Sequence, residues 1–134
     1  MIKNFVVGQS NELLMDGRVH EIHNFYRFGG LNIGPDRFIV ISFVPCEPNT
    51  MDFPRLKLEC RDVDYFELSS QFGCKDVREV DEMGYKSPGD LDDEWLMTEQ
   101  QASAADHFFL RLEHCAYIRV HGRYMRLVIV APQP

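Results

Sequence analysis

The chain has 134 residues, a formal net charge of −7, and 45% hydrophobic and 26% charged residues. These values suit one globular domain spanning residues 1–134, and ten Phe, five Tyr and one Trp supply enough apolar mass for a packed core, which excludes a disordered chain. The negative balance argues against duplex nucleic acid and against an anionic membrane surface as partners.

The N-terminal third predicts short elements. Residues 3–7 read as a strand, and residues 11–15 as a single helical turn capped by Ser10 and stopped by Gly17. Residues 18–28 read as a strand with a bulge, because no single alternation fits the whole length. Gly29-Gly30 and Gly34-Pro35 predict turns.

The middle of the chain predicts two strands of different character. Residues 37–44 are apolar on both alternating faces, which is typical of a central strand covered on both sides. Residues 55–61 alternate apolar and charged side chains, which indicates a half-buried strand. The sequence Asp62-Val63-Asp64 predicts a turn into a further strand at 65–69.

The C-terminal third alternates most regularly. Residues 108–114 predict a strand, and residues 116–120 and 123–130 predict a hairpin about His121-Gly122, since glycine suits the positive φ of hairpin turns. In that register Tyr117, Arg119, Tyr124 and Arg126 share one exposed aromatic and basic face.

Between these regions lies an acidic segment, residues 76–99, with nine acidic and two basic residues. We expect residues 76–89 to form a surface loop and residues 90–105 a helix, whose acidic first turn would suit the helix dipole. The predicted fold class is therefore α+β and β-rich: a largely antiparallel curved sheet or sandwich of about seven or eight strands with one or two short helices.

No motif in the chain predicts catalysis, a cofactor or a metal. His20 and His23 are one residue closer together than the histidines of a helical HExxH zinc site, and in a strand they would point to opposite faces. There is no CxxC pair. No apolar run has the length of a signal-peptide core or a membrane span, so we expect a cytoplasmic protein.

Two surfaces remain as candidate binding sites. The first is an acidic group with one tryptophan, which contains Asp90, Asp92, Asp93, Glu94 and Trp95. The second, which we call the Tyr–Arg face, is the exposed aromatic and basic face of the predicted hairpin.

A small, acidic, β-rich domain without catalytic motifs resembles, in general character, the immunity proteins of bacterial toxin systems. That resemblance implies a protein that neutralises a toxin by binding it, and it transfers no functional residue. The first hypothesis is therefore a non-enzymatic domain whose acidic surface binds a basic protein. The alternatives are a small-molecule or enzymatic domain with a pocket in the curved sheet, and a structural homo-oligomer, such as a homodimer, that uses the Tyr–Arg face.

Overall fold

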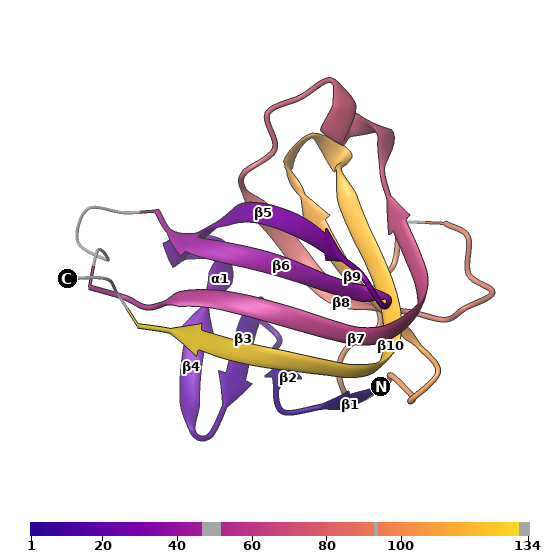
Figure 1. Cartoon of the computed structure of the whole chain (residues 1–134), viewed down its shortest axis with the longest axis horizontal. Coiled ribbons are helices and arrows are strands. Elements are labelled where there is room, and N and C mark those ends of the chain that lie inside the picture. The colour runs from indigo at the N-terminus through magenta and orange to yellow at the C-terminus, as the bar shows by residue number, and fades with distance from the viewer. Residues whose placement is uncertain (47–51, 93, 132–134) are drawn as a thin grey trace.

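The computed structural model describes residues 1–46, 52–92 and 94–131 and shows a β-rich fold (Figure 1). Its strands are β1 (Ile2–Lys3), β2 (Val6–Val7), β3 (Glu12–Met15), β4 (Arg18–Glu21), β5 (Tyr26–Gly34), β6 (Phe38–Pro45), β7 (Arg55–Leu68), β8 (Val80–Lys86), β9 (His107–Leu112) and β10 (Tyr117–Val130). One helical turn, α1 (Ile22–Phe25), and two 3-10 turns, η2 (Ser70–Gly73) and η3 (Glu113–Cys115), lie between them.

The strands that the structure describes form two sheets. The larger is seven-stranded in the order β5-β6-β7-β10-β9-β8, with β1 beside β10, and the smaller has the order β2-β3-β4. All neighbours pair antiparallel except β1 and β10. The predicted β-rich, largely antiparallel class is confirmed, although neither sheet is closed or strongly curled.

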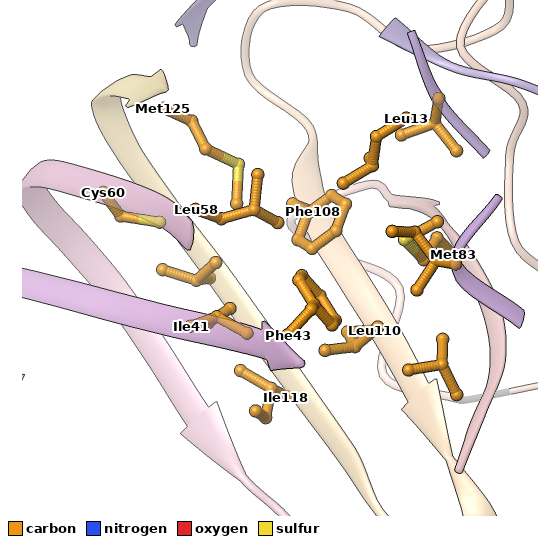
Figure 2. Packing of buried hydrophobic residues seen from close by; sticks show 14 of the residues in the cluster. Leu13, Ile41, Phe43, Leu58, Cys60, Met83, Phe108, Leu110, Ile118 and Met125 are labelled. Carbon is orange, nitrogen blue, oxygen red and sulfur yellow. The ribbon is translucent and has the colours of Figure 1, made fainter. Parts of the chain in front are cut away.

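The two sheets share one hydrophobic core. Figure 2 shows Phe43 of β6, Leu58 of β7 and Phe108 of β9 directed into the same layer, with Leu13 of β3 beyond them. All four side chains are fully buried. The core therefore holds the small sheet and α1 against the large sheet.

The longest pairing joins β7 to β10, and its ladder shifts register between His121 and Gly122. A Cβ atom on Gly122 would lie 2.6 Å from the carbonyl oxygen of Arg61, so only glycine allows the two backbones to approach there. The predicted turns at 62–64 and 121–122 are wrong: both segments lie in continuous strands, at the point where the pair is irregular. The predicted hairpin is absent, because residues 117–120 pair with β9 and β7 instead.

Other local predictions in the N-terminal third also differ from the structure. Residues 12–15 form β3 rather than a helical turn, because Asp16 and Gly17 take positive φ values of 52° and 75° and turn the chain into β4. The expected strand at 18–28 is interrupted by α1. Gly29-Gly30 lies inside β5, at a register shift, whereas the turn after Gly34 is confirmed.

The acidic segment is neither a loop throughout nor a helix. Residues 80–86 form β8, whose Met83 and Tyr85 are buried, because β8 pairs with β9. None of the described residues between 90 and 105 is helical. The backbone N–H of Asp92 donates to Asp90 Oδ1, and that of Glu94 donates to Asp92 Oδ1. Aspartate side chains thus bind the N–H groups near the expected helix start, which favours turns over a helix.

Candidate functional site

The acidic residues selected from the sequence lie on the connection between β8 and β9. We call its first part, residues 87–97, the tethered loop; Asp93 lies outside the described residues. Leu91 and Trp95 on this loop are 90% and 80% exposed. These are large apolar side chains in water, so what holds the loop in place decides whether they form a defined surface.

The first tether is the side chain of Lys86, the last residue of β8. Lys86 is 1% exposed, and its Nζ donates to Asp92 Oδ1 at 2.8 Å and to Asp90 Oδ2 at 3.2 Å. A buried ammonium group needs such partners, because burial without them removes its hydration at high cost. The hydrogen bond from Lys86 also lowers the pKa of Asp92.

The second tether is Arg119 of β10, expected on an exposed face but only 3% exposed. Its Nη1 donates to the carbonyl oxygen of Asp90 at 2.6 Å, and its Nη2 donates to that of Ser87 at 2.9 Å. Its Nε donates to His107 Nδ1 at 3.0 Å. The tethered loop covers Arg119, so Asp90 and Arg119, assigned by sequence to separate surfaces, are in direct contact.

The far end of the tethered loop is held through the backbone. The N–H of Tyr85 donates to the carbonyl oxygen of Met97 at 3.0 Å, and the N–H of Met97 donates back at 2.8 Å. Gly84 allows this approach, since a Cβ there would lie 2.8 Å from the Met97 oxygen. The loop is therefore fixed at both ends, with Leu91 and Trp95 between the attachments.

Ion pairs occupy much of the acidic segment. Besides Asp90 and Asp92, they involve Asp76 with Arg78, Glu82 with Arg111, and Glu99 with Lys3. Among the described residues of the segment, Glu79, Asp81 and Glu94 have no ion pair, so these carboxylates are available to a partner.

A polar and aromatic cluster lies behind Arg119. His107 stacks on Tyr65 with ring centroids 4.4 Å apart, and His121 lies 5.4 Å from His107. Because His107 Nδ1 accepts a hydrogen bond from Arg119, its proton belongs on Nε2 and the ring is neutral. Burial and, second, the charge of Arg119 lower the pKa of His107.

His121 joins this cluster to the chain that leads into β9. Its Nδ1 lies 2.6 Å from Asp64 Oδ1, and its Nε2 lies 3.1 Å from the carbonyl oxygen of Ala104. Both ring nitrogens thus face acceptor oxygens, and the cluster fastens the chain near Ala104 to the sheet.

The remaining residues of the predicted Tyr–Arg face are divided by the register shift in β10. Tyr117 stacks on Phe109 at 4.9 Å, and its hydroxyl donates to Glu67. This hydrogen bond is the main cause that lowers the pKa of Glu67. Beyond the shift, Tyr124 is half-buried and Arg126 is exposed.

A further ion pair fastens β1 to the chain after the tethered loop. Lys3 Nζ donates to Glu99 Oε1 and to the hydroxyl of Tyr85, beside a pocket of about 200 Å³. Burial lowers the pKa of Lys3, while the contact with Glu99 opposes that shift. The contacts join β1 to residues 85 and 99, so the geometry suits a structural role.

Residues 1–46, 52–92 and 94–131 contain no group of three or more His, Cys, Asp or Glu side chains arranged to hold a metal ion. Within the same residues, no helix has the length and apolar character needed to cross a membrane.

Comparison with protein-family models, with curated proteins and with solved structures found no match for the chain. Sequence reasoning selected Asp90, Asp92 and Trp95 from local acidity, but it missed Lys86 and Leu91. The signal in the sequence was the place of Leu91 between Asp90 and Asp92, since aspartates favour turns whose side chains face solvent.

Proposed function

We propose that this chain is a non-enzymatic protein-binding domain, and that its tethered loop docks onto a basic protein. The observation that carries the proposal is the pair of exposed side chains, Leu91 at 90% and Trp95 at 80%, on a loop held by the buried Lys86 and Arg119.

The chemistry of these two side chains favours a protein partner. Tryptophan is among the residues most enriched in the energetic centres of protein interfaces, where it is buried in a pocket of the partner. A loop that is already fixed loses little conformational entropy on binding, so more of the contact energy appears as affinity. The attachments of the tethered loop at both ends give Leu91 and Trp95 that advantage.

The charge around the loop favours a basic partner. Glu94 lies next to Trp95 in the chain, and the exposed Asp81 of β8 lines one pocket with Leu96 and Met97 of the tethered loop. With a net charge of −7, the whole chain attracts a cationic protein and raises the rate of association at low salt. A basic toxin or nuclease has this chemistry, in agreement with the toxin-neutralising hypothesis.

The proposal is tested by capture from the native lysate with three immobilised proteins: wild type, Leu91→Ala/Trp95→Ala, and Ile33→Ala. Ile33 is a matched control, because it is a large apolar residue on β5 that is 66% exposed. We expect a stoichiometric basic protein on wild type and on Ile33→Ala that is lost from the double variant. Truncation of an interface tryptophan costs about 2 kcal/mol or more, so Trp95→Ala should weaken the purified complex by roughly 30-fold.

The design separates a docking loop from a merely acidic surface. A partner retained equally by the double variant would contradict the proposal. Replacing the acidic residues together is a weaker test, because Asp90 and Asp92 neutralise the buried Lys86. Glu94→Gln is the charge variant that leaves the tethers intact, and we expect it to lower the association rate at low salt.

A further inference from the structure

His107, the first residue of β9, supports the Arg119 tether from behind. It is 6% exposed, and its Nδ1 accepts the hydrogen bond that Arg119 Nε donates at 3.0 Å. Only the neutral ring can accept this bond, because protonation of His107 places an N–H on Nδ1 and directs it at the positively charged guanidinium. The contact between His107 and Arg119 therefore exists in one protonation state of the imidazole.

The guanidinium group of Arg119 is rigid and planar, so its three nitrogens move together. Its Nη1 and Nη2 hold the carbonyl oxygens of Asp90 and Ser87 while its Nε faces His107. The imidazole ring has little room to withdraw, because it is buried and Tyr65 stacks on it at 4.4 Å. A proton on His107 therefore displaces the guanidinium from the ring and, with it, from both carbonyl oxygens of the tethered loop.

The groups around His107 decide the direction of the effect. Burial lowers the pKa of His107 most, and the charges of Arg119 and His121 lower it further, while Asp64 and Asp106 act in the opposite direction. Release of the loop hydrates the ring and separates it from Arg119, so the released form binds the proton more readily than the attached form. A falling pH therefore favours release. The titratable and charged side chains near His107 are Arg119 and His121 on β10, Asp64, Tyr65 and Glu67 on β7, Lys86 on β8, and Asp106 before β9.

We propose that His107 is a pH switch of the tethered loop: the neutral imidazole holds Arg119 against the loop, and the protonated imidazole displaces it and releases the loop. The switch is a property of the isolated chain. Its consequence for binding rests on the proposed function, because a released loop loses more conformational entropy on docking than a fixed one. The basic partner should therefore bind more weakly below about pH 6.5 than at neutral pH.

The test follows amide hydrogen exchange of the isolated protein at about pH 7.5 and about pH 5.5, a window that spans the ordinary pKa of histidine and lies above that of carboxyl groups. Rates are expressed as protection factors, which removes the pH dependence of the exchange chemistry. The N–H of Asp90, which donates to Ser87 O, and that of Glu94, which donates to Asp92 Oδ1, report on the loop. We expect their protection factors to fall by about three- to tenfold at the lower pH, as binding of one proton allows. The amides of the β7–β10 ladder should keep their protection.

Three variants make the result specific. His107→Gln takes no proton and keeps an oxygen that can accept from Arg119, so the protection of its loop should be the same at both pH values. Arg119→Met has no guanidinium to displace, so its loop should be poorly protected at both pH values. His114→Asn is the matched control, because His114 is exposed and its φ of 60° suits asparagine; this variant should respond to pH as wild type does.

Several results would overturn the inference. They are equal protection of the wild-type loop at the two pH values, an equal fall in His107→Gln, an undiminished pH response in Arg119→Met, or a fall shared by the amides of the β7–β10 ladder. These experiments contain no partner, whereas the docking proposal is tested by capture at neutral pH, so the two can fail separately.

Discussion

Arg119→Met is the substitution whose effect follows most directly from the structure. It removes the three hydrogen bonds to Asp90 O, Ser87 O and His107 Nδ1. Methionine keeps a long, unbranched side chain at this position of β10. A hydrogen bond to a charged group contributes about 1.5–3 kcal/mol. Ser87 is exposed and Asp90 partly so, and their carbonyl oxygens can regain water, while the buried His107 cannot. Removing the buried guanidinium also removes the cost of its desolvation, which offsets part of this loss of stability. We therefore expect the free energy of unfolding to fall by about 2–4 kcal/mol.

The assay has a global and a local readout. Urea denaturation followed by circular dichroism gives the free energy of unfolding. Amide hydrogen exchange of residues 87–97 and fluorescence anisotropy of Trp95, the one tryptophan in the chain, report on the tethered loop. We expect faster exchange and lower anisotropy in Arg119→Met. Arg126→Met is the matched control, because Arg126 is exposed on the same strand, and it should change the free energy of unfolding by less than about 0.5 kcal/mol.

The reasoning would be refuted if Arg119→Met and Arg126→Met had the same free energy of unfolding and the same exchange rates in the loop. Arg119 would then not be a tether, and the fixed presentation of Leu91 and Trp95 would lose its physical basis.

Three further predictions concern the fold and its charges. Gly122→Ala should lower the free energy of unfolding by about 1–3 kcal/mol in urea denaturation, because its Cβ would lie 2.6 Å from a backbone oxygen of β7. The control Gly73→Ala should leave the free energy of unfolding unchanged, because a Cβ there has no atom within 4 Å. Lys86→Met should raise the pKa of Asp92 towards its ordinary value of 3.8, as measured by carboxyl NMR titration, since the hydrogen bond that lowers it is lost; an unchanged pKa would argue against the pairing. The pKa of folded His107 lies below its ordinary value of 6.5, so the unfolded chain binds protons first as the pH falls. The contribution of His107 to the free energy of unfolding is therefore complete above about pH 7 and declines below about pH 6.5. Between about pH 7.5 and 5.5 the free energy of unfolding should fall less in His107→Gln than in wild type. An equal fall in the two proteins would contradict the lowered pKa of His107.

Local pattern was sufficient to locate two of the strands. The apolar side chains of residues 37–44 and 108–114 predicted β6 and β9, although β9 ends at Leu112 and a 3-10 turn follows it. The predicted turns at 62–64 and 121–122 could not be corrected from sequence. Each is a local irregularity, and only the pairing of β7 with β10 shows that the two coincide.

The site was less predictable than the fold, because its contacts are between distant parts of the chain. Asp90 and Arg119 are brought together by the order β8, β9, β10. The acidic run suggested a helix, since carboxylates favour a helix N-terminus, but Lys86 and the backbone N–H groups use the same carboxylates in turns. Likewise, His107 bonds to Arg119 across the β9–β10 pair, a contact that no spacing in the sequence indicates.

The central claim, that the tethered loop docks onto a basic protein, is tested most directly by the indole N–H signal of Trp95. The chain contains one tryptophan, so the ¹⁵N-labelled protein gives a single indole cross-peak. On addition of the unlabelled partner captured from the lysate, this peak and the amide of Leu91 should shift or broaden, while the amide of Ile33 stays in place. An unchanged indole peak in a saturated complex, with shifts confined to other surfaces, would contradict the account.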